Sequence, residues 1–447
     1  MTRKSYHAAQ RSRDFRGTAD TQQKLSLRVT RAPISDLKPD SENPRVHSER
    51  QLKQLAKSIR TFGFVQPVLI DGARRVLAGH GRIEAAKLLG LHEVPTISVR
   101  HLSEPQLRAL VIADNRLAEQ ASWNEKLLGE QLKFLSQIEL DFDLEATGFE
   151  VGEIDLLIEG LSPAPAGVHD PADEATVSAA SVTVTRRGDL WLAGPHRMYC
   201  GNSLEQSSFS NLMEGRKAAA VFVDPPFNVK IDGSVGDLGR GKHREFAMPS
   251  GEMSRADFIG LLTLACRFLV ANSTDGSLHY VCMDWRHLGE LLSASRKVYV
   301  ELEALCVWDK GTGGKGSIYR SQHELIFVFK NGKAPHRNNI REGQFDRSRA
   351  DIWDYPGLTK PVDLVADAIT DCTTRGEIVL DTFLGSGTTV LAAERTGRIC
   401  YGIEIDPVYV DAAVRRWQKF TGHEAVNAAS SRTFNELEEE AAHEPRE

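Results

Sequence analysis

The chain has 447 residues, of which 41% are hydrophobic and 26% charged, and its formal net charge is −6 at neutral pH. This length and composition are those of ordinary globular proteins and predict two or three domains. They exclude an integral membrane protein, because no segment of the sequence approaches the length and apolar character of a membrane span.

Six cysteines are scattered through the sequence and form no Cys-x-x-Cys pair. This spacing argues against a zinc site and against a disulfide framework, so we expect no metal and treat the cysteines as small buried residues in a reducing compartment. The start of the sequence shows no signal peptide. We therefore expect a cytoplasmic protein, associated with the nucleoid of a prokaryote or with a phage.

Residues 1–26 are polar and rich in Lys and Arg, with no apolar periodicity. We predict a disordered basic arm. The arm either contacts nucleic-acid phosphates or is a solvated terminus without a partner.

From residue 27 the pattern predicts a small α+β domain that extends to about residue 120. A strand is expected near Leu27 to Thr30, and a helix with apolar residues at helical spacing is expected to begin at Ser48 and to end at Gly63. Two short strands and a second helix, which ends at Gly90, should follow.

The second helix of this domain begins at a glycine turn with the sequence Gly79-His80-Gly81-Arg82. A helix N-terminus with a guanidinium beside it is suited to bind an anion. Together with Asn43-Pro44-Arg45, this layout resembles the N-terminal domain of the ParB partition family and its sulfiredoxin relatives. The turn is therefore a candidate nucleotide or phosphate site, with a contact to a DNA phosphate and a purely structural turn as the alternatives.

Residues 121–160 show helical amphipathic spacing and form a predicted helical extension. In partition proteins such helices include a DNA-binding helix-turn-helix. The acidic residues between Glu139 and Glu159 fit a DNA groove poorly, so we expect a packing or dimerising role and list a homodimer among the candidate assemblies. Residues 161–180, rich in Ala and Pro, form a predicted linker.

A larger domain is predicted over residues 181–420, followed by a charged tail at 421–447. Its central motif is Asp224-Pro225-Pro226-Phe227, which comes directly after the apolar strand Ala218 to Val223. Two prolines fix the backbone so that the first carbonyls become rigid acceptors, and the phenylalanine offers a stacking face. An amino group on a flat base would find two acceptors here, the Asp224 side chain and the Pro225 carbonyl.

The stretch from Asn228 to Gly251 has no periodicity and is expected to be a loop over the reaction site, or else a solvated surface loop. Alternating apolar strands and helices follow, which predict a parallel-rich sheet covered on both faces. A basic segment then lies between residues 330 and 353. It contains side chains that read base edges or contact phosphates, and it is the candidate DNA-recognition segment. Its candidate residues are Lys330, Arg337, Asn338, Asn339, Arg341, Arg347 and Arg349; a solvated basic loop is the alternative.

A strand that ends at Asp381 leads into a glycine-rich turn and then a helix. Such a turn lets the backbone approach a nucleotide-like ligand, and the helix N-terminus offers N–H groups. A second strand ends at Glu404, where a doubly wound sheet places an acid on ribose hydroxyls. The candidate cofactor residues are Lys360, Asp381, Phe383, Gly385, Ser386, Gly387, Thr388 and Glu404.

These paired motifs resemble the S-adenosylmethionine-dependent DNA amino-methyltransferases, in the circularly permuted order called beta. The resemblance implies a Rossmann-like α/β fold with a mixed, mostly parallel sheet and S-adenosyl-L-methionine as cofactor. It also implies double-stranded DNA as substrate, base flipping, and Asp224, Pro225, Pro226 and Phe227 as the catalytic tetrapeptide. Lys360, in the Lys-Pro at the end of a segment that flanks the cofactor in this group, would contact the methionine carboxylate. A histidine common in that segment is absent here.

An Asp at the first position of the tetrapeptide leans, within this family, towards N6 of adenine. N4 of cytosine is the first alternative. A different class of function also stays open, a ParB-like DNA- or nucleotide-binding partition module whose transferase half is inactive. The intact tetrapeptide and glycine turn speak against that loss.

Overall fold

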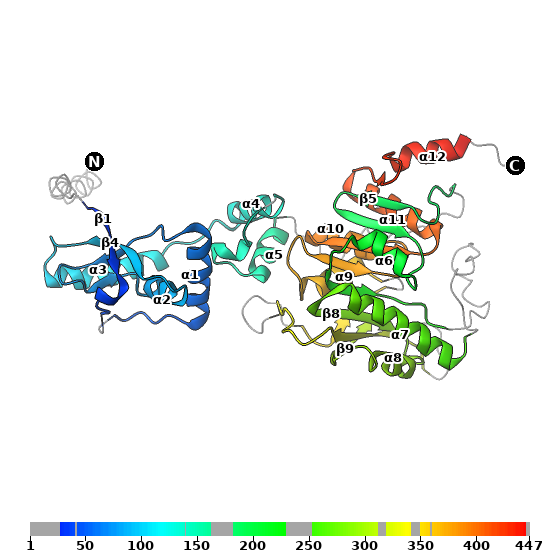
Figure 1. The fold of residues 1–447 in the computed structure, drawn as a ribbon, viewed down its shortest axis with the longest axis horizontal. Helices are drawn as coiled ribbons and strands as arrows, with labels where there is room; N and C mark the ends of the chain where they lie inside the picture. The colour runs from blue at the N-terminus through cyan, green and yellow to red at the C-terminus, as the bar shows by residue number, and fades with distance from the viewer. Residues whose placement is uncertain are drawn as a thin grey trace, which may run out of the picture. The chain divides into compact units, whose positions relative to one another are not determined.

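The computed structural model describes residues 27–40, 43–138, 140–161, 182–228, 253–311, 319–340, 349–357 and 360–443. The chain divides into two compact units, residues 1–150 and 151–447 (Figure 1). The expected basic arm, nearly all of the expected linker and the loop after Asn228 lie outside the described residues. Among the described helices, none is both long and apolar enough to cross a membrane.

The first unit contains a four-stranded mixed sheet in the order β1-β4-β2-β3. Strands β1 and β4 are antiparallel, as are β2 and β3, whereas β2 and β4 are parallel. Its core joins apolar residues of the strands to Ile83 and Ala86 of helix α2. The elements are β1 (Val29–Pro33), η2 (Ile34–Asp36), α1 (Glu49–Phe62), β2 (Val68–Ile70), β3 (Val76–Ala78), α2 (His80–Leu88) and β4 (Glu93–Ser98).

Both ends of α1 follow from the sequence. The Ser48 hydroxyl accepts a hydrogen bond from the backbone N–H of Gln51 at 3.1 Å, which satisfies one of the free donors of the first turn. Gly63 ends the helix with a φ of +80°. The predicted helix is thereby confirmed.

Three further helical elements complete the first unit: α3 (Glu104–Glu119), α4 (Glu125–Ser136) and the short η3 (Leu144–Thr147). Helix α3 begins with a capping box formed by Ser103 and Gln106. The next helix, α5 (Val151–Glu159), belongs to the second unit.

The second unit is built on a ten-stranded sheet in the order β11-β9-β10-β8-β7-β12-β13-β6-β5-β14. The central strands β8, β7, β12, β13 and β6 are parallel to one another. Antiparallel pairs β8/β10, β10/β9, β6/β5 and β5/β14 flank them. The strands are β5 (Leu190–Ala193), β6 (His196–Cys200), β7 (Ala218–Val223), β8 (Ser273–Met283), β9 (Glu301–Asp309), β10 (His323–Lys330), β11 (Ile352–Asp354), β12 (Ile378–Asp381), β13 (Ile399–Glu404) and β14 (Val426–Asn427).

Helices cover both faces of this sheet (Figure 1). One core packs the sheet against α9 (Val362–Thr370), α10 (Thr388–Thr396) and α11 (Pro407–Thr421). The other packs it against α6 (Gln206–Met213), α7 (Arg255–Ala271) and α8 (Leu288–Ser295). The predicted α/β class, with a mixed and mostly parallel sheet after a smaller α+β domain, is confirmed.

Two segments flank the larger predicted domain. Ahead of β5, the expected linker ends where the buried Asp411 accepts hydrogen bonds from the backbone N–H groups of Val184 and Thr185 at 2.8 and 3.0 Å. Much of the segment expected as a charged tail is ordered, because β14 pairs with β5 and α12 (Phe434–His443) begins at a fully buried phenylalanine. The six cysteines are all buried and free.

Candidate active site

The two motifs singled out in the sequence meet at one edge of the large sheet. Strand β7 ends just before Asp224, and β12 ends at Asp381. The strands are parallel neighbours, with Leu380 opposite Val221, so their carboxyl ends lie side by side. Glu404 ends the next parallel strand, β13. In open α/β sheets ligands bind at this edge.

The tetrapeptide after β7 combines an exposed acid with a fixed aromatic ring. The Asp224 side chain is 41% exposed, whereas Pro225 is buried. Phe227 is half-buried and packs against both cores of the unit. The carboxylate can therefore meet a ligand while the backbone that carries it is held by packing.

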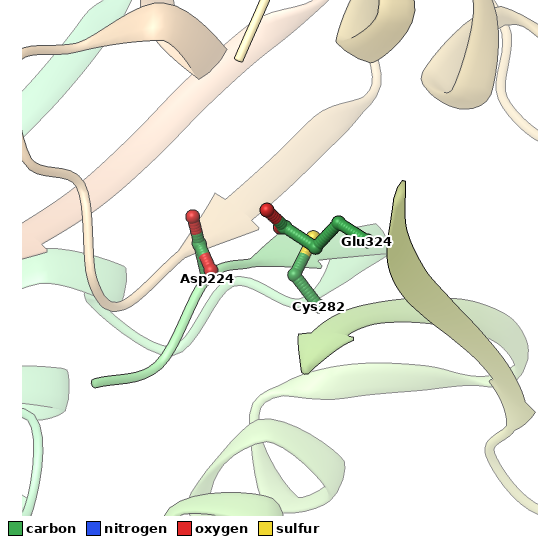
Figure 2. Close-up of side chains that lie close together, drawn as sticks. All are labelled: Asp224, Cys282 and Glu324. Atoms are coloured by element: carbon green, nitrogen blue, oxygen red, sulfur yellow. The ribbon is translucent and has the colours of Figure 1, made fainter. Parts of the chain in front are cut away.

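Lys360 is the centre of a polar cluster around this acid. Its Nζ lies 2.9 Å from Asp224 Oδ2, 2.9 Å from Cys282 Sγ and 2.8 Å from Glu324 Oε1. Figure 2 shows the three acceptors, which come from the end of β7, from β8 and from β10. The predicted contact of Lys360 with a cofactor carboxylate stays a prediction, since the structure places the ammonium among the acidic groups.

The charges of this cluster set its protonation states. Burial would lower the pKa of Lys360, but the carboxylates of Asp224 and Glu324 raise it well above its usual value. Burial would raise the pKa of Glu324, but Lys360 and Lys310 lower it. For Asp224 desolvation outweighs the attraction of Lys360 and raises the pKa. Burial also raises the pKa of Cys282, which is therefore a neutral thiol.

Asp224, Cys282 and Glu324 offer ligand atoms within 4.8 Å of one another, a spacing at which three such groups could hold a metal ion. The ammonium of Lys360 contacts all three of them. The cluster thus holds a lysine cation in the place that a metal would need.

The predicted cofactor motif forms a glycine turn at the start of α10. Gly385 and Gly387 have φ values of +54° and +86°, which favour glycine. A Cβ on Gly385 would stand in open space, with only the Phe383 carbonyl at 4.0 Å, whereas one on Gly387 would meet the Ala413 Cβ at 2.7 Å. The first glycine keeps a surface open and the second lets α10 and α11 pack.

Three charged side chains hold this turn. Glu404 accepts hydrogen bonds from the N–H of Gly385 at 2.8 Å and of Asp406 at 2.9 Å. Arg416 of α11 donates to the Ser386 carbonyl at 2.8 Å and to its hydroxyl at 3.0 Å. Asp381 accepts from Phe383 N–H at 3.0 Å and from the Thr389 hydroxyl at 2.6 Å, and burial raises its pKa to about 7.

The candidate DNA-recognition residues do not form one group. Asn339 donates to the carbonyls of Thr370 and Thr373, and Arg349 pairs with Asp371 at 3.0 Å, so both side chains bond within the fold. Asn338 caps its own turn by accepting from Ile340 N–H. Arg337 is exposed, and Lys330 lies 3.4 Å from Glu303. Arg341 and Arg347 lie outside the described residues.

The glycine turn predicted as an anion site in the first unit lies at the start of α2, and its role stays a prediction. Gly79 has a φ of +104° and precedes α2 without a capping side chain. His80 begins that helix, and burial lowers its pKa. Arg82 Nη1 donates to Gln66 Oε1 at 2.9 Å. A Cβ on Gly81 would come within 3.0 Å of the His47 ring.

Sequence reasoning missed several residues at the active-site edge. Glu324 and Lys310, whose side chains are 2.8 Å apart, were not among the candidate residues. Trp285, 46% exposed just beyond β8, has Arg286 over its ring at 4.7 Å. The available signal for Glu324 was an acid directly before the apolar run Leu325 to Phe329.

Three protein families match the chain. A DNA methylase family of the N6/N4 type matches residues 218–415, the ParB N-terminal domain matches residues 18–116, and a ParB-methyltransferase helix-turn-helix domain matches residues 126–187. The last match overlaps the helical extension predicted for residues 121–160, whose packing or dimerising role stays a prediction.

Individual proteins match either half. The ParB-like nuclease domain-containing protein YnaK of Escherichia coli K12 is 41% identical over 80 residues, which are 18% of this chain and 92% of YnaK. A probable chromosome 2-partitioning protein ParB of Deinococcus radiodurans is 42% identical over 87 residues, 19% of this chain and 29% of that protein. Among solved structures, the PvuII cytosine-N4-specific DNA methyltransferase is 16% identical, with a TM-score of 0.39 over 54% of this chain and 94% of that one. After the N-terminal domain come a ParB-methyltransferase helix-turn-helix domain and a DNA methylase domain of the N6/N4 type. Through its N-terminal domain, the chain belongs to the ParB-like family.

Proposed function

We propose that this chain transfers a methyl group from S-adenosyl-L-methionine to the exocyclic N6 of adenine in double-stranded DNA. The observation that carries the proposal is the adjacency of two motifs about 150 residues apart, the Asp224 tetrapeptide and the glycine turn, at the ends of neighbouring parallel strands.

The glycine turn fits this cofactor. Gly385 leaves open space beside the N-terminus of α10, and Glu404 stands at the end of the next strand, where ribose hydroxyls are bound in doubly wound sheets. Asp381, Phe383, Ser386 and Thr388 belong to the same turn and would line the site. When bound, S-adenosylmethionine supplies an electrophilic methyl group on a sulfonium.

The chain's own residues would position the amine. Asp224 and the Pro225 carbonyl accept the two N–H bonds of the amino group, which turns the nitrogen lone pair out of the ring plane. Phe227 stacks on the base. Because Lys360 already holds Asp224 Oδ2, the other carboxylate oxygen is left to receive the substrate.

A base inside the double helix cannot reach this edge of the sheet, so the target nucleotide has to leave the stack. Trp285 and Arg286 lie just beyond β8, the strand next to β7, and offer an exposed aromatic face with a cation on it. Such a pair suits an unstacked base or its neighbour. The helix-turn-helix domain and Arg337 would supply contacts to the duplex.

The turn from Gly79 to Arg82 would bind a nucleotide or a phosphate. An uncapped helix N-terminus and the guanidinium of Arg82 support an anion there. The first domain would then serve as the module that places the methylase on DNA.

The test is transfer of labelled methyl from S-adenosylmethionine to unmethylated DNA, followed by nucleoside analysis. N6-methyladenine that disappears with Asp224→Ala supports the proposal. N4-methylcytosine would keep the enzyme class and overturn the choice of base, an alternative that the N6/N4 family match leaves open. DNA binding without transfer to any base would favour an inactive methylase half.

A further inference from the structure

Four charged side chains, the candidate catalytic acid Asp224 among them, form a row of alternating charge. Lys310 Nζ lies 2.8 Å from Glu324 Oε2, Lys360 Nζ lies 2.8 Å from Glu324 Oε1, and the same Nζ lies 2.9 Å from Asp224 Oδ2. Each oxygen of Glu324 thus contacts a different lysine. Along this row the order is Lys310, Glu324, Lys360 and Asp224.

The two middle members of this row are the most buried. The side chains of Glu324 and Lys360 are 10% and 11% exposed, whereas those of Lys310 and Asp224 are 20% and 41% exposed. A buried charge without a partner is unstable, so Lys360 needs Glu324 as well as Asp224. The rings of Phe222 and Trp308 lie 5.8 and 5.6 Å from the lysine Nζ and close the site on its apolar side.

Glu324 is not placed to meet the amine, because its side chain is only 10% exposed and Lys360 contacts both it and Asp224. Its contribution is geometric: it holds the ammonium in one place, and the ammonium holds one oxygen of Asp224. The two carboxylate oxygens of Glu324 contact two different lysines, which a glutamate that only stabilised strand β10 would not require.

We propose that Glu324 is a positioning residue for methyl transfer, which acts through Lys360 to fix the orientation of the Asp224 carboxylate. This inference rests on the proposed function. Positioning within a fraction of an ångström is worth large factors in rate, so loss of the glutamate charge should act on turnover and leave cofactor affinity nearly unchanged.

The first experiment compares kinetics of the full-length wild type with Glu324→Gln, Glu324→Asp and Glu290→Gln. Glu290 of α8 is the matched control, since its side chain is 15% exposed and pairs at 3.0 Å with Arg255 of α7, outside the Lys360 cluster. We expect kcat to fall about tenfold or more in Glu324→Gln, with the KM for S-adenosylmethionine within about twofold of wild type. Glu324→Asp should recover part of the loss and Glu290→Gln should behave as wild type.

The pH dependence of kcat is a second measurement, which would not change if Glu324 had only a structural role. Asp224 faces Lys360, Glu324, Cys282 and Lys310, and Asp381 at the end of the neighbouring strand β12 interacts with it electrostatically. The negative charge of Glu324 is one cause that raises the pKa of Asp224. In Glu324→Gln the acid limb of the kcat profile should move to lower pH. An unshifted limb with unchanged kcat would overturn the inference while the wild-type activity still supported the proposed function.

A third measurement needs no turnover. Acylation of Lys360 by an amine reagent, followed by mass spectrometry of the cofactor-free protein, reports how tightly the ammonium is held. Faster labelling in Glu324→Gln than in wild type or Glu290→Gln is expected. Equal labelling in all three proteins would contradict the role of Glu324 even if the wild type proved inactive on DNA.

Discussion

Asp155 of α5 forms a two-pronged ion pair with Arg398 at the start of β13, with Nη1–Oδ1 and Nη2–Oδ2 distances of 3.1 and 2.8 Å. Both side chains are fully buried, and Arg375 adds a third contact at 2.8 Å. The segment that carries Asp155 lies within the helix-turn-helix match, yet the ion pair ties it to the methylase sheet. The helix-turn-helix domain therefore shares an element with the methylase unit.

Asp155→Ala should destabilise the second unit by about 3–5 kcal/mol, because it leaves buried guanidinium charge without its partner. Urea unfolding followed by tryptophan fluorescence measures this, since five of the six tryptophans lie after residue 150. Asp363→Ala is the matched control. Its partner Arg395 forms an exposed pair that is worth about 0–1 kcal/mol. A similar loss in both variants would contradict the account.

The two glycines of the cofactor turn should respond differently to alanine. Gly387→Ala forces a Cβ to 2.7 Å from Ala413, between α10 and α11, and places alanine at a φ of +86°. We expect it to lower the free energy of unfolding by about 2–4 kcal/mol. Gly385→Ala adds only the backbone cost of about 1 kcal/mol. Thermal unfolding ranks the two; a larger loss for Gly385→Ala would refute the division of roles.

The sequence could predict what depends on local patterns. Ser48 and Gly63 mark the ends of α1, and Asp406, directly before Pro407, caps α11 by accepting from Val408 N–H. The strand ends at Asp224, Asp381 and Glu404 were also visible. The Lys360 cluster could not be predicted, because Lys360 and Glu324 are 36 residues apart in the sequence. They meet only because β10 pairs antiparallel with β8 in the folded sheet. Long-range polar contacts leave no periodicity in a sequence.

Long-range contacts also explain why the candidate DNA-recognition residues do not form one group. Arg, Asn and Lys side chains look alike in a sequence whether they face solvent or the fold. Asn339 donates to two backbone carbonyls and Arg349 donates to Asp371. The residues next to them in the sequence do not indicate these contacts. Composition could indicate a basic segment but not which of its members are available to DNA.

Asp381 should make stability depend on pH in a definite direction. Burial raises its pKa from 3.8 to about 7, so the folded state binds a proton that the unfolded state has lost between these values. The stabilisation is complete below about pH 4 and is lost as the pH rises to 7, by at most about 4 kcal/mol.

Asp381→Asn should remove this dependence. The amide can replace the protonated acid beside Phe383 and Thr389, so the variant should be more stable than wild type at pH 8 and closer to it at pH 5. Urea unfolding at pH 5 and at pH 8 gives the difference in unfolding free energy between variant and wild type. Other titrating groups are the same in both proteins, so their contributions cancel in this difference. A constant difference between pH 5 and pH 8 would show that Asp381 does not carry a raised pKa.

The first unit should lose anion binding when the start of α2 is altered. Gly81→Ala pushes a Cβ to within 3.0 Å of the His47 ring, and Arg82→Ala removes the guanidinium. Calorimetric titration of the full-length protein with nucleoside triphosphates should show binding that either change weakens about tenfold or more. Lys87→Ala, near the other end of the helix, is the control. Binding that is equal in all variants would place the nucleotide elsewhere.

Glu404 is the residue whose loss should weaken cofactor binding most directly. Its two oxygens accept from the N–H groups of Gly385 and Asp406, so it fixes the turn and also presents its charge at the end of β13. Glu404→Gln removes that charge and one acceptor, which should raise the Kd for S-adenosylmethionine about 10- to 100-fold. Glu377→Gln is the matched control, because Glu377 also accepts a backbone N–H, from Thr374 at 2.7 Å, but precedes β12 at the opposite edge of the sheet. Calorimetry without DNA separates this effect from catalysis. An unchanged Kd in Glu404→Gln would remove Glu404 from the cofactor site, and an equal loss in both variants would reduce its role to holding the fold.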